Sequence, residues 1–236
     1  MPYADFGKKI EAFWKKENDM IRYVGFDMDG TLADTLDDVT NAVNFGLSQI
    51  GCPKRGRGDI QKFIGDSVYD LISRAMAPLS DSRLLEKAKQ GFDLYYEQHY
   101  CSETRLYPGM ERFIHELLSM DINLFIYSNK QIEFVKKMLQ RLLPDVAFSG
   151  VLGNSKGFAP KPDPEQFLAF QKRESFEKLE CLLIGYSDID IKAAKNAGIY
   201  SVGVLWGYGE RSRLLNAQAD LYTEDCGEIL KWIQKK

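Results

Sequence analysis

The chain has 236 residues, of which 44% are hydrophobic and 28% are charged, and its 31 basic and 34 acidic side chains leave a formal net charge of −3. This composition is typical of a protein with a packed core and excludes a disordered or collagen-like chain. Because basic residues are not in excess, we expect neither nucleic acid nor an anionic membrane surface as the main partner. The longest apolar runs, 122–127 and 202–206, fall far short of the ~18 residues that cross a bilayer, so we predict no membrane span.

The N-terminal residues and the cysteines indicate a cytoplasmic protein. Residues 1–20 are charged and lack the apolar region and the cleavage site of a secretory signal. The four cysteines are far apart, form no Cys-x-x-Cys motif and are accompanied by only two histidines. A disulfide framework and a zinc site are therefore not expected.

In chain order, the first predicted element is an amphipathic helix over 8–20, within an N-terminal extension of residues 1–21. Short apolar runs then predict strands, and amphipathic stripes between them predict helices. The predicted strands cover 22–27, 122–127, 146–152, 181–185 and 201–205. The predicted helices cover 110–119, 131–142, 164–173 and 189–197. This alternation indicates an α/β fold with a parallel sheet covered on both faces.

Residues 34–101 interrupt the alternation. Apolar residues recur at helical spacing in 39–50 and again in 84–100, and no segment between them has a convincing strand pattern. We therefore predict a helical insert between the first strand and the rest of the sheet.

Two carboxylates follow the first predicted strand. Alternate strand residues face the same side, so Asp27 and Asp29 can both face one site at the carboxyl end, where open parallel sheets bind ligands. The two carboxylates of such a pair can have different roles, because one can attack phosphorus while the other transfers protons. An acidic turn without function is the alternative. A calcium-binding EF-hand loop is excluded, because that loop needs glycine at its sixth position. Counted from Asp27, the fifth and sixth positions here are Thr31 and Leu32.

Two weaker signals suit phosphate. Ser128-Asn129-Lys130 follows the next core strand, and its hydroxyl, its amide and the N–H groups of the following helix can bind phosphate oxygens. The same tripeptide is also typical of an ordinary helix N-cap. Lys161 has a proline on either side, and this stiffened loop can hold a positive charge in place. The alternative is that Lys161 is a solvent-exposed lysine without a role in binding.

The fourth signal is the strand 181–185, which leads into an acidic turn and a helix. Acidic oxygens here, with those of Asp27, would complete a magnesium site, because Mg²⁺ prefers carboxylate and water oxygens. Capping of the following helix by Asp188 is the alternative.

These four signals, in this order, resemble the haloacid dehalogenase-like superfamily of aspartate-nucleophile hydrolases. Further segments are similar to its phosphoglycolate phosphatase-like branch: 30–35, 106–109, 128–130, 161–164 and 203–209. The resemblance covers nearly everything after Arg22. It implies a Rossmann-like core, residues 22–33 and 104–236, interrupted by a helical cap, residues 34–103, that closes over the site.

The resemblance also implies roles for individual residues. Asp27 would be the nucleophile and a magnesium ligand, and Asp29 the general acid and base whose main-chain carbonyl also binds the metal. Ser128 and Lys161 would hold the phosphoryl group. Asp190 matches the remaining acidic metal ligand. The expected substrate-binding residues are Thr31, Asn129 and, from a cap loop, Gly65 and Asp66.

One position departs from the pattern. Relatives usually have Gly-Asp where this chain has Gly185-Tyr186, and a phenol with a reference pKa of ~10 is a poor magnesium ligand. Asp190 would then bind the ion with extra waters, Asp188 would substitute, or the metal affinity would be low enough to weaken or abolish turnover.

The resulting hypothesis is a Mg²⁺-dependent phosphatase that hydrolyses a small phosphorylated metabolite through a phosphoaspartate on Asp27. Phosphoglycolate is the nominal substrate from the resemblance alone. The main alternative, motivated by Tyr186, is a catalytically weak or inactive protein that binds a phosphorylated ligand. A phosphomutase of the same superfamily is a further alternative.

Overall fold

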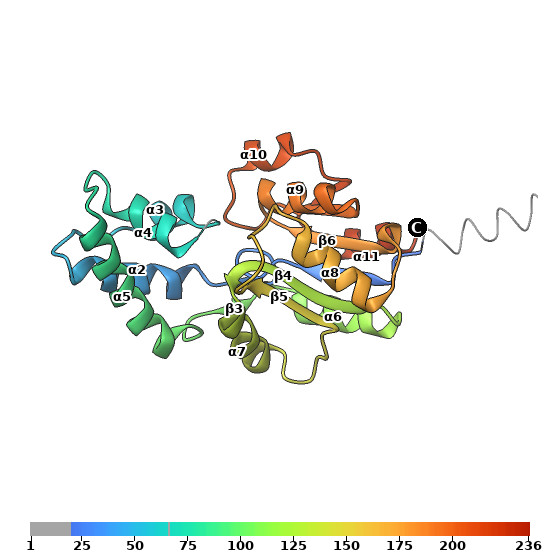
Figure 1. The fold of residues 1–236 in the computed structure, drawn as a ribbon. Helices are drawn as coiled ribbons and strands as arrows, with labels where there is room; N and C mark the ends of the chain where they lie inside the picture. Colours follow the sequence, from blue (N-terminus) through green and yellow to red (C-terminus); the bar gives the residue numbers. More distant parts are fainter. Residues whose placement is uncertain (1–19, 66) are drawn as a thin grey trace, which may run out of the picture.

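The computed structural model describes residues 20–65 and 67–236. The helix predicted over 8–20 therefore lies, apart from Met20, outside the described residues. Six strands form one parallel sheet in the order β5-β4-β1-β6-β7-β8 (Figure 1). They are β1 (Tyr23–Phe26), β4 (Asn123–Gln131), β5 (Gly150–Asn154), β6 (Cys181–Gly185), β7 (Tyr200–Val204) and β8 (Leu221–Thr223). The predicted α/β fold with a parallel sheet is confirmed.

Helices cover both faces of this sheet (Figure 1). On β4, Leu124 and Ile126 belong to a core shared with α6 (Met110–Ser119), α7 (Ile132–Leu142) and α11 (Cys226–Ile233). The alternate residues, Phe125 and Tyr127, face a second core shared with α8 (Glu165–Glu174) and α9 (Asp188–Ala197). Burial on both faces explains why these strands are apolar runs rather than alternating patterns.

Short elements complete this part of the chain: the 3₁₀ helix η1 (Lys178–Glu180) and the helix α10 (Arg211–Asn216). With β8 and α11, α10 lies in a C-terminal region where the sequence pattern predicted no elements. Among the described residues, no helix combines the length and the apolar character needed to cross a membrane.

Four helices form a separate group beside the sheet (Figure 1). They are α2 (Leu36–Ser48), α3 (Arg57–Phe63), α4 (Val68–Met76) and α5 (Ser82–His99), called the cap helices below. Helix α2 packs along α5, and a Cβ added at Gly46 would lie 2.3 Å from the carbonyl oxygen of Ala88. Glycine at this position therefore permits the close approach of the two helices.

A narrow neck joins the cap helices to the sheet. It is the two-stranded antiparallel ribbon of β2 (Ala33–Asp34) and β3 (Arg105–Leu106). The buried carboxylate of Asp38 accepts hydrogen bonds from Glu103 N at 3.0 Å, Thr104 N at 2.9 Å and Thr104 Oγ1 at 2.7 Å. One acidic side chain thus ties the outgoing chain to the returning chain.

Candidate active site

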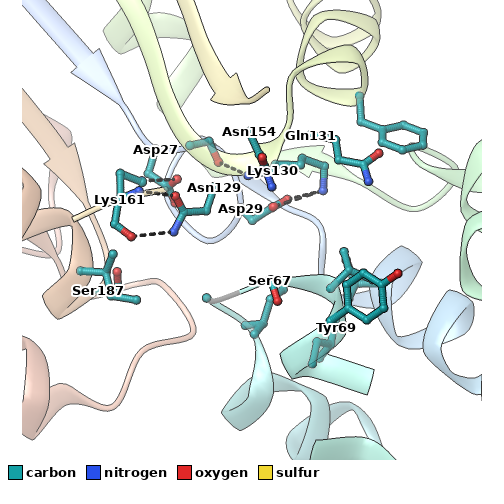
Figure 2. Close-up of a pocket in the computed structure, with 18 of the residues that line it drawn as sticks. Asp27, Asp29, Ser67, Tyr69, Asn129, Lys130, Gln131, Asn154, Lys161 and Ser187 are labelled. Carbon is teal, nitrogen blue, oxygen red and sulfur yellow. Dashed lines mark hydrogen bonds and ion pairs between the residues drawn. The ribbon is translucent and has the colours of Figure 1, made fainter. Parts of the chain in front are cut away.

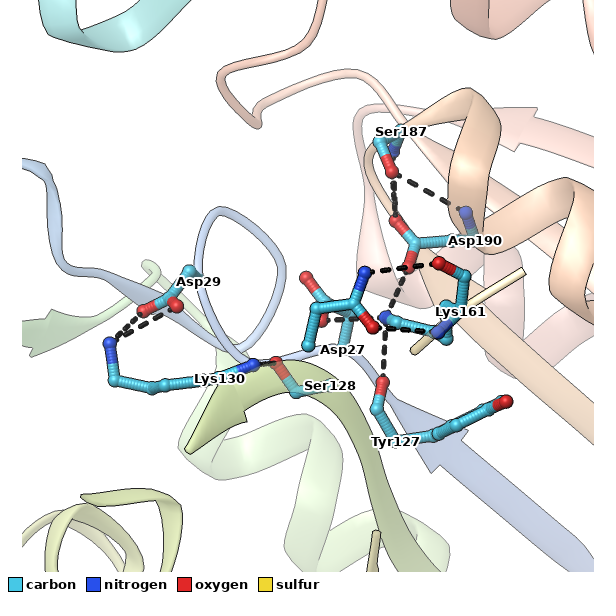
Figure 3. A network of polar contacts seen from close by, with 9 residues as sticks. Asp27, Asp29, Tyr127, Ser128, Lys130, Lys161, Ser187 and Asp190 are labelled. Atoms are coloured by element: carbon cyan, nitrogen blue, oxygen red, sulfur yellow. Dashed lines mark hydrogen bonds and ion pairs between the residues drawn. The ribbon is translucent and has the colours of Figure 1, made fainter. Parts of the chain in front are cut away.

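Three charged side chains converge at the carboxyl ends of the central strands. Asp27 follows β1, Asp190 lies in the first turn of α9 after β6, and Lys161 comes from the loop before α8. Lys161 Nζ lies 2.9 Å from Asp27 Oδ1, 2.5 Å from Asp190 Oδ1 and 2.8 Å from the carbonyl oxygen of Tyr127 (Figure 3). All three charged residues are buried, at 5% exposure or less. The site therefore holds one buried cation between two buried carboxylates.

Local geometry fixes the position of Asp190. A Cβ at Gly185 would lie 2.2 Å from Asp190 Cβ, so the last residue of β6 has to be glycine for this carboxylate to lie against the strand. Asp190 Oδ2 accepts hydrogen bonds from Ser187 N at 3.0 Å and Ser187 Oγ at 2.7 Å. Ser187 and Asp190 thus form the capping box of α9.

Asp188 has a different environment from the one that the sequence suggested. It is the first residue of α9 and not its N-cap, which is Ser187. Its carboxylate pairs with Lys192 Nζ at 2.7 Å and with Arg213 at 3.2 Å. Asp188 does not line the cavity that contains Asp27. The alternative reading of Asp188 as the helix cap is therefore wrong, and the structure does not bring it to Asp27.

The second carboxylate of the pair has its own lysine. β4 continues beyond the core and carries Lys130, whose Nζ lies 2.9 and 3.1 Å from the two oxygens of Asp29 (Figure 3). The same Nζ lies 4.9 Å from the ring centroid of Tyr96 on α5. Burial lowers the pKa of Lys130, but the charges and hydrogen bonds of Asp29 and Tyr96 together outweigh burial, and the net pKa is raised. Lys130 therefore stays protonated beside Asp29.

Ser128 and Asn129 also lie at the end of the core portion of β4, and both line the cavity. Ser128 Oγ accepts a hydrogen bond from Lys130 N at 3.3 Å. Asn129 Oδ1 accepts from Lys161 N at 2.7 Å, and its Nδ2 donates to Lys161 O at 3.2 Å (Figure 2). Asn129 thus fixes the backbone of the loop that presents the lysine.

The remaining expected substrate-binding residues lie in different places. Thr31 is fully buried and does not line the cavity, and its carbonyl accepts a hydrogen bond from Trp206 Nε1 at 3.1 Å. The structure therefore places Thr31 inside the protein, so its side chain is not positioned to contact a substrate. Gly65 lines the cavity from the cap side. Asp66 lies outside the described residues.

A cavity of about 200 Å³ separates these groups from the cap helices. Ser67 and Tyr69 face Asp29 and Asn129 across it (Figure 2). The volume is below the ~300–1,000 Å³ of pockets for drug-sized ligands and suits a small molecule.

Sequence reasoning missed several of the residues that line this cavity. Lys130 carried a signal, because it directly follows Ser128-Asn129. The missed residues of the cap side and α7, which include Lys89, Phe92, Asp93, Tyr96 and Phe134, carried only helical periodicity.

Burial governs the protonation of the site. It raises the pKa of Asp27 to about 7, and the charges of Asp190 and Asp29 act in the same direction, while Lys161 opposes them. Burial also raises the pKa of Tyr186 well above its ordinary value, so this phenol stays protonated and neutral. The position after Gly185 therefore holds a neutral hydroxyl and not a carboxylate.

The donor set does not make a complete magnesium site. Asp190 uses both side-chain oxygens for Lys161 and Ser187, and Lys161 also binds Asp27 Oδ1. Over residues 20–65 and 67–236, no three His, Cys, Asp or Glu side chains are grouped to hold a metal ion. Mg²⁺ needs several oxygen ligands in near-octahedral geometry. The residues present therefore do not fit the ion that the sequence pattern implies.

Comparisons with known proteins agree with this architecture. Residues 24–204 match the family model described as haloacid dehalogenase-like hydrolase. The chain is 30% identical over 217 residues to a phosphoglycolate phosphatase of Vibrio cholerae serotype O1, covering 89% of this chain and 96% of that protein. It is 32% identical over 198 residues to a phosphoglycolate phosphatase of Neisseria gonorrhoeae, covering 82% and 84%.

A solved structure shows the same arrangement. A haloacid dehalogenase-like family hydrolase from Streptococcus pneumoniae superposes with a TM-score of 0.81 at 27% identity, covering 91% of this chain and 99% of that chain. The family match spans most of the sequence, from β1 to the end of β7. The chain therefore belongs to the haloacid dehalogenase-like hydrolase family.

Proposed function

We propose that the protein is a phosphatase that hydrolyses small phosphomonoesters, with Asp27 as the nucleophile. The observation that carries the proposal is the buried Asp27–Lys161–Asp190 group at the strand ends, beside a cavity of small-molecule size. The names of the relatives, which are phosphoglycolate phosphatases, support the same reaction class.

The proposed chemistry divides the work between the two carboxylates. Asp27 attacks phosphorus, and the P–O bond to the leaving group breaks as an acyl phosphate forms on Asp27. Asp29 takes up the proton of the phosphomonoester monoanion and passes it to the leaving oxygen, then takes one from the water that hydrolyses the acyl phosphate, so that phosphate and the free alcohol are released. Lys161 offsets negative charge on the phosphoryl oxygens, and Ser128 and Asn129 lie beside them.

Magnesium dependence stays a prediction from the family resemblance. Because the donor set is incomplete, the proposed chemistry includes no step through the ion. We further propose that residues 34–103 act as a cap over a core of residues 22–33 and 104–236, because the cavity lies between these two parts. A cytoplasmic location completes the proposal.

Phosphate release from a panel of small phosphate esters tests the activity. Wild type, Asp27→Asn and Tyr186→Asp are assayed in EDTA and in excess Mg²⁺. Release by the wild type above the Asp27→Asn background, by about three orders of magnitude or more, is the expected result.

The second candidate is a protein that binds a phosphorylated ligand without turning it over, which the neutral Tyr186 in place of a carboxylate favours. If the wild type equals Asp27→Asn on every ester while Tyr186→Asp releases phosphate in Mg²⁺, this candidate replaces the phosphatase.

A further inference from the structure

We infer that the substrate carries an uncharged, apolar leaving group, alkyl or arylalkyl, and not the carboxylate-bearing group of phosphoglycolate. The inference rests on the proposed function for the reaction, and on the part of the cavity away from Asp27 for the choice of substrate. This part of the cavity is the wall that the leaving group of the substrate would contact.

Every cation that lines the described cavity already has a carboxylate partner. The lining lysines are Lys161, Lys130 and Lys89, and no arginine or histidine of the described residues joins them. Lys161 and Lys130 are paired with Asp27 and Asp29, as described above. On the cap side, Lys89 Nζ lies 2.5 Å from Asp93 Oδ2, one turn further along α5.

The charge balance of the cavity opposes a second anion on the substrate. Among the described residues that line the cavity, three lysines face four aspartates: Asp27, Asp29, Asp93 and Asp190. The proposed function places the phosphoryl group at Lys161, which leaves the carboxylate of a glycolate only Lys130 and Lys89 among the described lining cations, and each of these already pairs with an aspartate. An unpaired charge in a partly buried site carries a large desolvation cost.

Aromatic rings line the part of the cavity that lies away from Asp27. Phe92 and Tyr96 on α5 stack with ring centroids 5.2 Å apart, and Tyr96 meets Phe134 of α7 edge-on at 4.9 Å. Because α5 belongs to the cap helices and α7 covers the sheet, this wall runs across both parts. Ile64 and Val68, which are half-buried, extend the apolar lining. Phe92 and Tyr96 are themselves buried, so the half-buried Phe134, Ile64 and Val68 offer the apolar surface that a ligand group would contact.

Matched esters test the inference on the active protein. Benzyl phosphate, phosphoglycolate and sn-glycerol 3-phosphate all have a CH₂–O–P linkage and differ in the rest of the leaving group. We expect kcat/KM for benzyl phosphate to exceed both others by about tenfold or more, a ratio that corresponds to ~1.4 kcal/mol. Equal or higher kcat/KM for phosphoglycolate, or for the uncharged polar glycerol ester, overturns the inference and leaves the phosphatase proposal intact.

A cap variant tests the role of the paired lysine. Asp93→Asn removes the partner of Lys89 and should raise kcat/KM for phosphoglycolate by roughly fivefold, with little change for benzyl phosphate. Glu97→Gln is the matched control, since it removes the same charge from the same helix at a residue that pairs with Lys137 outside the cavity. An unchanged ratio of the two substrates in Asp93→Asn contradicts the assignment of Lys89.

Binding of phosphonates separates this inference from the proposed function. By calorimetry, 2-phenylethylphosphonate, the isostere of benzyl phosphate, should bind at least about tenfold more tightly than 3-phosphonopropionate, the isostere of phosphoglycolate. That result supports the inference even in a protein that hydrolyses no ester, a finding that would remove the phosphatase proposal alone. Tighter or equal binding of 3-phosphonopropionate, or binding of neither compound, overturns the inference.

Discussion

The two sides of the cavity hold their charges in different ways. On the sheet side, Lys161 has three hydrogen-bond partners from three separate segments and is buried. On the cap side, Lys89 pairs with a single carboxylate one turn away on its own helix, and that carboxylate is 41% exposed. The sheet side therefore holds the charge of Lys161 in one position, whereas on the cap side Asp93 neutralises the charge of Lys89. In the proposed function, the sheet side carries out the chemistry and the cap side selects the substrate.

Removal of the central cation should have the largest effect on the sheet side. Lys161→Met leaves Asp27 and Asp190 buried without a counter-ion, and we expect a loss of about 3–5 kcal/mol in the free energy of unfolding. Denaturant titration measures it. Lys137→Met, which breaks the exposed pair with Glu97, is the control and should change stability by less than about 1 kcal/mol. Equal effects of the two variants would mean that the central charge is not fixed as described.

The pH dependence of stability tests the same site without removing the lysine. The pKa of Asp27 is raised to about 7, so the native protein binds this proton more tightly than the unfolded chain does. The stabilisation is present at low pH and is lost as pH rises through about 7. In EDTA, the Tm of wild type minus the Tm of Asp27→Asn should therefore fall between about pH 5 and pH 8. A difference that grows with pH would show that Lys161 outweighs burial.

A substitution in the neck should have a smaller effect on the free energy of unfolding. Asp38→Asn weakens the three hydrogen bonds that Asp38 accepts from Glu103 and Thr104, and we expect a loss of about 1–3 kcal/mol by denaturant titration. Asp37→Asn is the control one residue away, because Asp37 is exposed and pairs only with Arg57 among the described contacts. A loss in Asp37→Asn as large as that in Asp38→Asn would contradict the role of Asp38 in the neck.

A contact between the sheet side and the start of α2 should give the smallest effect. The hydroxyl of Tyr208 donates to Asp34 Oδ1 at 2.7 Å and accepts from Leu36 N at 3.1 Å. Tyr208→Phe should cost about 0.5–1.5 kcal/mol in unfolding free energy. Tyr69→Phe, whose hydroxyl bonds Glu86 on the surface of the cap, serves as the control and should cost less. Equal costs would show that the buried contact adds nothing beyond an exposed one.

The sheet side could largely be predicted from the sequence. Apolar runs located five of the six strands, because residues buried on both faces leave little else in a strand. Parallel strands end at one edge of the sheet, so Asp27 and the acidic turn after β6 could be expected at a common site. The pattern could not show that Lys161 would lie between Asp27 and Asp190, since that depends on the loop that Asn129 holds.

The cavity-lining residues of the cap side could not be predicted from the sequence, for a physical reason. On a helix, an apolar stripe packs equally well against another helix or around a ligand, so Phe92 and Tyr96 carried no sign of a cavity. Lys89 and Asp93 have the i,i+4 spacing of an ordinary surface ion pair. Only the assembled fold brings these residues opposite Phe134 and the strand ends.

The neck has a consequence for how this architecture can diversify. Ala33 pairs with Leu106, so the chain leaves the sheet side and returns to it at neighbouring points, about 4.8 Å apart across the ribbon. The pairing of β2 with β3 therefore sets little constraint on the length of the chain between them, provided that contacts such as those of Asp38 with Glu103 and Thr104 hold the neck together. Segments of other sizes can be exchanged at this position while the strand order and the Asp27–Lys161 pair are retained. New substrate ranges can thus arise by replacement of one contiguous stretch of chain.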